Sequence, residues 1–476
     1  MSDRTLHSVF RDNQRARRVG VAAALFLVLA MIPVDRALAQ RSLLAREGSS
    51  AIDAQINSGS YTIPSAFWGM HINNLFTPWP VSYFTNQRMA GSDIFWWNVE
   101  VAPGQYDFFW FDQWMAQAQA HGVTVMYTFA GIPQWYSSVP NDTNCAYEDG
   151  ACDPPKDLNE DGSGTDAAFK NYVTAVVNHA GSQIQYWEIW NEPNEHKQWT
   201  PTCITLKNCS GNLKYAQLLR MASDARAIIL AAYPNALILS PASVGWPGSA
   251  TGWMEGWLNA GGGQYADVIA FHGYLNQWVM GHFPVAENEA KLIGQMKYVV
   301  KKYGQQTKPL WITEGGWGNV LLDGYSDAVL QSAFLARYIL IQQSRGIARG
   351  YWYQWDSPFG AGTLFQGPAA PNIRMAGYAY NSIVNWTNGA TISVPCTLQK
   401  GTSVWTCRYT RSTPAGYKAL VVWNAKQNST FTLSQGYAQY CDLKGNVTAL
   451  QGKKVQIGMW PILLENENLG ATACKP

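Results

Sequence analysis

Two glutamates in the sequence each stand where an apolar run ends. In "YWEIWNEPN" (186–194), apolar and polar residues alternate as in a strand until the Asn-Glu-Pro around Glu192 stops the pattern. In "KPLWITEGGWG" (308–318), Glu314 closes a second apolar run. A pair of carboxylates suits cleavage of a glycosidic bond: the protonated one releases the leaving oxygen, and the ionised one attacks or stabilises the sugar carbon. Either sequence alone also fits an ordinary turn, so the hypothesis depends on the pair.

The elements that must position this pair form a repeating pattern. Between residues 61 and 385, short apolar runs alternate with stretches whose apolar residues recur at helical spacing. The candidate strands are 67–72, 84–89, 123–129, 184–190, 236–240, 268–272, 309–313 and 350–354. Strands that alternate with helices pair in parallel, and eight such units in about 320 residues predict a (β/α)8 barrel of the TIM type. The alternative is an open doubly wound sheet, but no Gly-x-Gly-x-x-Gly follows the first strand.

A barrel of this kind would bring the two glutamates together. Active sites of such barrels lie at the carboxyl ends of the strands. Glu192 closes the fourth candidate strand and Glu314 closes the seventh. We therefore expect the two carboxylates to face each other across the mouth of the barrel.

The pattern changes near Thr391, where short alternating runs are separated by Gly, Asn, Pro and Ser. We predict a signal peptide at 1–39, a catalytic barrel at 40–388 and a small all-β sandwich domain at 389–476. The N-terminus supports the first of these, because five arginines precede an apolar run and the small residues Ala-Leu-Ala at 37–39. An uncleaved membrane anchor is the alternative.

Composition narrows the function classes. The formal net charge of +2 gives no reason to expect nucleic acid or an anionic membrane as a partner. Eight cysteines in a secreted or periplasmic chain predict disulfides, with neighbours in sequence as the expected pairs. Neither Cys-x-x-Cys nor His-Glu-x-x-His occurs, so we expect no metal and no cofactor.

On these residues the chain resembles the retaining glycoside hydrolases of clan A, and most closely glycoside hydrolase family 39, the β-xylosidases and related enzymes. The resemblance covers the barrel and extends to a β-sandwich after it. It implies that Glu192 is the general acid/base, that Asn191 holds the 2-hydroxyl of the substrate, and that Glu314 is the nucleophile. Two sequences depart from the family: "NVEVAP" (98–103) interrupts a usual Glu-Pro, and "EGGWG" (314–318) sets the chain apart from typical xylosidases.

The resemblance also implies roles for five polar residues at strand ends. The sequence "FHGY" matches a His-x-Tyr at strand six, so His272 is expected to position groups or contact sugar. The hydroxyl of Tyr274 is expected to bond the nucleophile. Arg88 on strand two is expected beside that nucleophile, and His71 and Asn73 match a polar pair at the end of strand one.

Physical chemistry is consistent with the two glutamate roles. Partial burial against Trp190 and the charge of Glu314 should raise the pKa of Glu192, so that it starts each cycle protonated. Arg88 and the Tyr274 hydroxyl should keep Glu314 ionised. Aromatic residues in rim loops are candidates for sugar contact, with core packing as the competing use: Trp135, Trp199, Trp278, Trp317, and Trp352 or Trp355.

The loop "DLNEDGSGTD" (157–166) has a different possible use. Asp157, Asn159, Asp161 and Gly162 match the first half of a calcium loop, but the twelfth position is Ala168 and offers no carboxylate. A solvated loop without an ion is the other interpretation.

The sequence thus predicts a secreted retaining glycosidase that acts on a plant or microbial oligo- or polysaccharide. An endo-acting depolymerase with the same site is one alternative. A non-catalytic carbohydrate-binding barrel is another, and the complete set of polar residues argues against it.

Overall fold

The computed structural model describes residues 47–245, 248–275, 285–317, 327–356, 362–365, 373–434, 436–466 and 473–474 of the 476-residue chain. The predicted signal peptide lies outside this part. Within it, no helix combines the length and the apolar character needed to cross a membrane.

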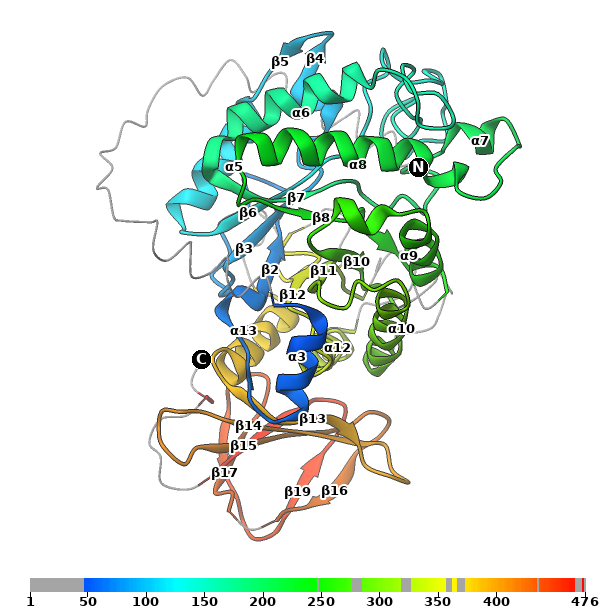
Figure 1. The fold of residues 1–476 in the computed structure, drawn as a ribbon. Helices are drawn as coiled ribbons and strands as arrows, with labels where there is room; N and C mark the ends of the chain where they lie inside the picture. Colours follow the sequence, from blue (N-terminus) through cyan, green and yellow to red (C-terminus); the bar gives the residue numbers. More distant parts are fainter. Residues whose placement is uncertain are drawn as a thin grey trace, which may run out of the picture.

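A parallel barrel forms the larger part of the molecule (Figure 1). Its strands are β2 (Trp68–His71), β3 (Asn86–Met89), β6 (Thr124–Thr128), β7 (Ile184–Glu188), β8 (Leu237–Leu239), β9 (Ser243–Val244), β10 (Ile269–His272), β11 (Leu310–Glu314) and β12 (Arg349–Trp352). They follow the order β8-β7-β6-β3-β2-β12-β11-β10-β9. β8 and β9 are two parts of the fifth strand, because β8 pairs with β7, β9 pairs with β10, and Leu239 bridges to Val268. The ring therefore closes with eight strand positions, and the predicted barrel is confirmed.

Helices surround the barrel: α5 (Phe109–Ala120), α6 (Ala167–Ala180), α8 (Leu213–Ala232), α9 (Ala250–Asn259), α10 (Glu289–Lys302), α12 (Ala328–Ser344) and α13 (Met375–Thr387). Shorter elements are α3 (Ser49–Asn57), η1 (Ser65–Phe67), α4 (Trp96–Val99), β4 (Glu100–Ala102), β5 (Gln105–Tyr106), η2 (Gly181–Gln183), α7 (Thr202–Thr205), η3 (Gly262–Tyr265) and η4 (Ala286–Asn288). The strict alternation fails once. The fully described segment 72–85 after β2 contains no helix, since Pro78 and Pro80 cannot supply helical N–H groups.

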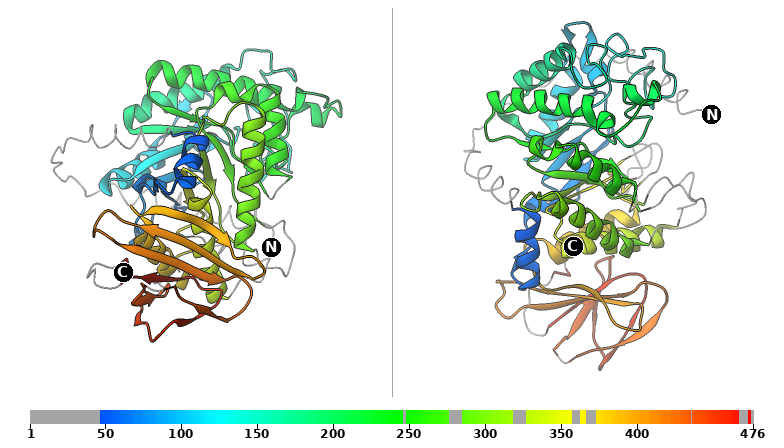
Figure 2. Two further views of the ribbon diagram at one scale, coloured as in Figure 1. Left: turned by 60° about the horizontal axis from the view of Figure 1, so that its bottom comes forward. Right: turned by 45° about the vertical axis from the view of Figure 1, so that its right-hand side comes forward.

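The C-terminal part is a β-sandwich. Its strands are β13 (Thr391–Leu398), β14 (Val404–Thr410), β15 (Lys418–Asn424), β16 (Ser429–Thr432), β17 (Gln439–Cys441), β18 (Val447–Ala449), β19 (Lys454–Ile457) and β20 (Ile462–Glu465). The β16–β19 pair packs on the larger antiparallel sheet through an apolar cluster that includes Val422, Val455 and Leu464. Figure 2 shows the sandwich at one end of the molecule, next to the barrel.

The sandwich is joined to the barrel domain by side-chain hydrogen bonds and by a strand pairing. Arg345 at the end of α12 donates a hydrogen bond to the Cys396 carbonyl at 3.1 Å, and Ser382 of α13 donates to the Leu443 carbonyl at 3.0 Å. In addition, β1 (Tyr61–Thr62) pairs with β13, so a segment that precedes the barrel strands joins the C-terminal sheet. The predicted domain boundaries stay a prediction.

The four predicted disulfides are confirmed. They join Cys145 to Cys152, Cys203 to Cys209, Cys396 to Cys407, and Cys441 to Cys474. Two lie in loops of the barrel and two in the sandwich.

Candidate active site

The backbone at Glu192 turns sharply at the end of the fourth strand. Glu192 has φ +44°, a left-handed conformation that costs free energy for a residue with a Cβ. Its N–H donates to the Ala242 carbonyl of the fifth strand at 3.0 Å, which holds the turn in place. Pro193 follows and needs no hydrogen-bond acceptor. With the backbone in this conformation, the Glu192 carboxylate lies against His272 at the end of the sixth strand.

Glu314, at the end of β11, is held by two donors. Arg88 Nη1 donates to its Oε2 at 2.7 Å, and the Tyr274 hydroxyl donates to its Oε1 at 2.8 Å. Both donors were predicted to lie beside Glu314, and the structure places them there. Arg88 is fully buried on β3, so its charge lies in a region that water screens poorly.

Glu192 and Glu314 meet at His272. His272 Nδ1 lies 2.7 Å from Glu192 Oε1 and 3.6 Å from Glu314 Oε2. One carboxylate oxygen of each glutamate and the imidazole nitrogen all lie within 4.8 Å of one another. The side chains of Glu192 and Glu314 remain 17% and 12% exposed, so both reach the barrel mouth.

This arrangement agrees with the comparison to known proteins. Residues 110–358, more than half of the chain, match the family model described as Cellulase (glycosyl hydrolase family 5). The chain belongs to this family. The predicted membership in clan A and the predicted glycosidase class are confirmed. Assignment to family 39 in particular stays a prediction.

Solved structures support the fold of this glycosyl hydrolase. A family 39 glycoside hydrolase from Bacteroides cellulosilyticus WH2 matches with a TM-score of 0.59 at 17% identity, over 81% of this chain and 76% of that one. A GH39 β-xylosidase from Caulobacter crescentus gives 0.54 at 13% identity, over 90% and 94%. CelM2, a bifunctional glucanase-xylanase from a metagenome library, gives 0.53 at 17% identity, over 86% and 98%. No curated protein matches the sequence.

Burial raises the pKa of both glutamates of this glycosyl hydrolase, but their neighbours differ. Burial raises the pKa of Glu192 to about 7; Arg88 opposes this shift, and the charges of Glu195 and Glu188 add to it. Burial also raises the pKa of Glu314, while His272, Arg88 and Tyr274 lower it. Since Glu314 has two direct donors, we expect Glu192 to carry the proton of the pair.

His272 is neutral in this environment. Burial lowers its pKa to about 4, against the pull of the Glu314 charge. Its contact with Glu192 is therefore a hydrogen bond between an imidazole and a carboxyl group, and not an ion pair. His272 is fully buried, so its place favours positioning over sugar contact.

A third carboxylate, Glu188, completes the charge arrangement and was missed in the sequence. Arg88 donates to Glu188 Oε2 through Nε at 3.0 Å and Nη2 at 2.7 Å, and Thr128 donates to the same oxygen at 2.8 Å. The sequence held an indication of this, because side chains alternate along a strand and Glu188 and Glu192 are an even number of residues apart. Arg88 Nη2 also donates to Asn191 Oδ1 at 2.8 Å, so this contact fixes the amide and does not use its NH2 group.

The polar pair of the first strand lies beside a tyrosine that was not predicted. His71 Nε2 and Asn73 Oδ1 are 3.0 Å apart, and the His71 ring lies 4.8 Å from that of Tyr353. The pKa of Tyr353 is raised well above its usual value by burial and then by the Glu314 charge. Tyr353 and Tyr274 rings are 6.4 Å apart, so these side chains line one side of the glutamate pair.

Most of the expected sugar-contacting tryptophans are buried instead. Trp317 and Trp352 are only 1% and 3% exposed, their rings lie 5.2 Å apart, and Trp352 Nε1 donates to the Gly362 carbonyl. Trp199 and Trp355 are buried as well. These four tryptophans therefore pack in the core, the competing use that the sequence left open for them. Trp135 is half-buried in the loop after β6, and Trp278 lies outside the described residues.

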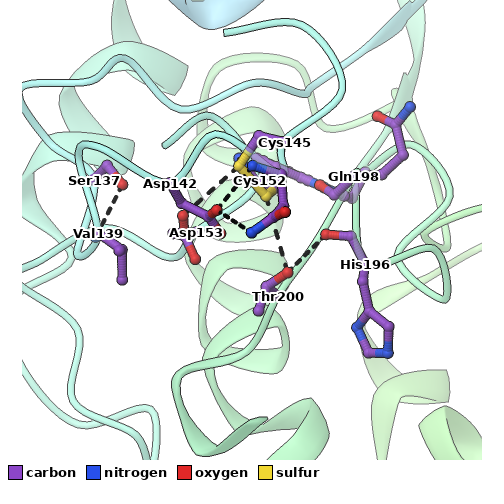
Figure 3. Close-up of a disulfide and its surroundings, with 11 residues drawn as sticks. Ser137, Val139, Asp142, Cys145, Cys152, Asp153, His196, Gln198 and Thr200 are labelled. Atoms are coloured by element: carbon purple, nitrogen blue, oxygen red, sulfur yellow. Dashed lines mark hydrogen bonds between the residues drawn. A yellow bond between two sulfur atoms is a disulfide. The ribbon is translucent and has the colours of Figure 1, made fainter. Parts of the chain in front are cut away.

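A disulfide-closed loop contributes a further aromatic residue at the rim. The Cys145–Cys152 disulfide closes this loop (Figure 3). Tyr147 lies between the two cysteines in the sequence, is 39% exposed, and has a pKa that the charges of Glu192 and Glu314 help to raise. Two backbone hydrogen bonds, Ala146 N to Lys197 O and Thr200 N to Cys152 O, tie this loop to the segment after Glu192. Tyr147 also packs against Phe95 and Trp97.

The loop 157–166 has filled its calcium-like positions with protein groups. Asp157 Oδ2 accepts from Ala167 N at 2.6 Å and Ala168 N at 3.3 Å, so it caps the first turn of α6. The Arg220 guanidinium donates to the carbonyls of Gly162, Gly164 and Thr165. Two other calcium-like oxygens also accept hydrogen bonds from the protein: Asp161 Oδ1 accepts from Ser163 N at 2.9 Å, and the Ser163 carbonyl accepts from Asn159 N at 2.8 Å.

Proposed function

We propose that this enzyme is a secreted retaining glycosidase that cleaves O-glycosidic bonds of a plant or microbial oligo- or polysaccharide. The observation that supports this most is the separation of Glu192 and Glu314, with carboxylate oxygens within 4.8 Å. Retaining enzymes hold their two carboxyl groups roughly 5 to 5.5 Å apart, whereas inverting enzymes need about 6.5 to 9.5 Å for a water. The four disulfides are compatible with an oxidising compartment.

In the first step, Glu314 attacks the anomeric carbon while Glu192 donates its proton to the leaving oxygen. Asn191 donates its amide to the sugar 2-hydroxyl. The ester that forms removes the charge of Glu314, so the pKa of Glu192 falls and Glu192 accepts a proton from water in the second step. Water then releases the sugar with its anomeric configuration retained. Arg88 and Tyr274 hold Glu314 in line throughout.

No metal takes part in this mechanism. Glu192, His272 and Glu314 lie close enough together to hold an ion. However, both Glu314 oxygens already accept hydrogen bonds from Arg88 and Tyr274, and a Glu192 with pKa about 7 keeps its proton. We expect a chelator to leave turnover unchanged, and loss of activity with EDTA that Zn²⁺ restores would contradict this.

The central test replaces each glutamate. Glu314→Ala should abolish turnover of aryl glycosides, and added azide should restore it with a product of inverted configuration. Glu192→Gln should spare substrates whose leaving group needs no proton and stop the others. Glu255→Gln is the control, because Glu255 is partly exposed on α9 and pairs with Lys302 rather than with a group of the site. Full activity of Glu314→Ala without azide would remove Glu314 from its role.

Product size distinguishes two modes of action. An exo-acting enzyme releases one sugar unit from the chain end, and an endo-acting depolymerase gives a ladder of oligosaccharides from the start. A panel of aryl glycosides and polysaccharides, with early products separated by length and anomer, decides between them.

A further inference from the structure

Two glycines stand next to the catalytic side chains. Gly273 separates His272 from Tyr274, and Gly315 follows Glu314. Neither has a positive φ, so backbone conformation does not require glycine at either position. Space does. A Cβ on Gly315 would lie 2.1 Å from the Tyr338 hydroxyl oxygen, and a Cβ on Gly273 would lie 2.3 Å from the same atom.

Tyr338 belongs to α12, and its hydroxyl lies next to both glycines. Its hydroxyl donates to the Gly273 carbonyl at 2.8 Å, and the Gly273 N–H donates to the Glu314 carbonyl at 2.8 Å. A chain of two hydrogen bonds therefore joins α12 to the ends of β10 and β11. Those are the strand ends from which Tyr274 and Glu314 project, so the location of the hydroxyl fixes the spacing between them.

The surroundings of Tyr338 separate it from substrate. The residue is 2% exposed and packs against Phe334, with ring centroids 5.3 Å apart. Glu289 lies beside Gly273, is fully buried, and accepts a weak hydrogen bond from Gln342 at 3.4 Å. Burial raises the pKa of Glu289 well above its usual value, so it is neutral. Tyr338 can act on the reaction only through the backbone of the two strands.

We propose that Tyr338 is a positioning residue, whose hydroxyl is wedged between Gly273 and Gly315 and sets the contact between the Tyr274 hydroxyl and the Glu314 carboxylate. This inference rests on the proposed nucleophilic role of Glu314. It also accounts for the first glycine of "EGGWG", the sequence that departs from typical xylosidases. The second glycine has a separate reason, because a Cβ on Gly316 would lie 2.5 Å from the Tyr353 carbonyl oxygen.

The test is a rescue experiment with Tyr338→Phe, Gly315→Ala and the double variant. Gly315→Ala should lower kcat by about 10²-fold, the order expected when a catalytic group moves by about 1 Å. Tyr338→Phe should lower kcat by about tenfold, since one buried hydrogen bond is lost. In the double variant, kcat should recover from the Gly315→Ala value toward that of Tyr338→Phe. The hydroxyl that the added methyl group would strike is gone, and the next atom, the ring Cζ at 3.1 Å, needs a shift of only a few tenths of an ångström.

A pH profile separates positioning from general stability. If the Tyr274 contact loosens, the pKa of Glu314 rises, and the acidic limb of kcat/KM in Tyr338→Phe should move to higher pH. Tyr380→Phe is the matched control, since Tyr380 is equally buried and its hydroxyl has no hydrogen-bond partner among the described residues. Thermal unfolding of all variants is measured in parallel.

Two results would overturn the inference. The first is that Tyr338→Phe has the same kcat and the same acidic limb as Tyr380→Phe. The second is that Gly315→Ala lowers kcat by the same factor in the wild type and in Tyr338→Phe. If Gly315→Ala fails to fold, the kcat and pH profile of Tyr338→Phe decide alone. If wild type and Tyr380→Phe hydrolyse no glycoside, the proposed function fails and takes this inference with it.

Discussion

Arg88 and Glu314 form a buried ion pair across the barrel, from the second strand to the seventh, with 2.7 Å between Nη1 and Oε2. The same guanidinium also forms an ion pair with Glu188, so one buried cation binds two carboxylates. Burial works against the charge of Arg88, but Glu188 and Glu314 outweigh it and raise the pKa of Arg88. Arg88 is therefore charged at every pH at which the enzyme is folded, and it is the fixed charge that favours an ionised Glu314.

Arg88→Lys should retain the charge but lose the fork of donors. We expect kcat to fall by roughly 10² to 10³-fold, the usual cost of removing one preorganised polar contact in an active site. The acidic limb of kcat/KM should also move to higher pH, because the contact that lowers the pKa of Glu314 is weakened. Arg226→Lys is the control, since Arg226 pairs with Asp267 away from the two glutamates. An unchanged acidic limb would show that Arg88 does not tune Glu314.

The alkaline limb of the pH profile should report Glu192. Its pKa is raised to about 7, so the protonated form needed for acid catalysis is lost as pH rises through that value. With substrates that have a poor leaving group, kcat/KM should fall with an apparent pKa near 7. Glu192→Gln, assayed on activated aryl glycosides, should lack this limb. A limb that persists in Glu192→Gln would have to come from another group.

The disulfide loop at the rim should affect substrate binding more than chemistry. Replacing both Cys145 and Cys152 with Ser frees the loop that presents Tyr147. We expect KM to rise by about tenfold, equivalent to about 1.4 kcal/mol, with a smaller change in kcat. Comparing Tyr147→Phe with Tyr147→Ala separates the hydroxyl from the ring. The Cys203–Cys209 pair, replaced in the same way, is the control, and an equal rise in KM there would argue against a specific role for Tyr147.

Calcium should not stabilise this protein, because Asp157, Asp161 and the Ser163 carbonyl in the 157–166 loop already accept hydrogen bonds from the protein. The Tm of the wild type should be the same with EDTA and with added Ca²⁺. Arg220→Met should lower Tm only slightly, since the three carbonyls that lose its hydrogen bonds are exposed or partly buried and water can replace the donor. Arg226→Met is the comparison. A Tm of the wild type that rises with Ca²⁺ would restore the calcium interpretation of the loop.

Asp166 should make the protein less stable as pH rises from about 4 to about 8. This carboxyl is fully buried, its oxygens accept no hydrogen bond from the described residues, and burial with the neighbouring Asp224 raises its pKa to about 8. The folded state thus binds a proton more tightly than the unfolded state. The resulting stability is present below about pH 4, the unfolded value, and is lost as pH rises through about 8. Asp166→Asn should remove the part of the fall in Tm between pH 4 and pH 8 that comes from this carboxyl, whereas the exposed Asp161→Asn should not.

The sequence by itself determined the large features of this enzyme. Alternating apolar runs and helical spacing fixed the barrel, because hydrophobic periodicity is a local property of the chain. The same runs located Glu192 and Glu314 at strand ends, and cysteines that are neighbours in sequence indicated the four disulfides. The sandwich followed from short alternating strands. The sequence also shows why no helix follows β2, since prolines at 78 and 80 disfavour one.

Only the tertiary structure decided which side chains meet. Glu188 joins the site because Arg88 reaches it from another strand, and Tyr338 because α12 packs behind two glycines that are 42 residues apart in the chain. Trp317 and Trp352, expected from the sequence to contact sugar, pack against each other in the core. A sequence states which groups a chain carries, but distances between groups far apart along it depend on packing, which no local pattern encodes.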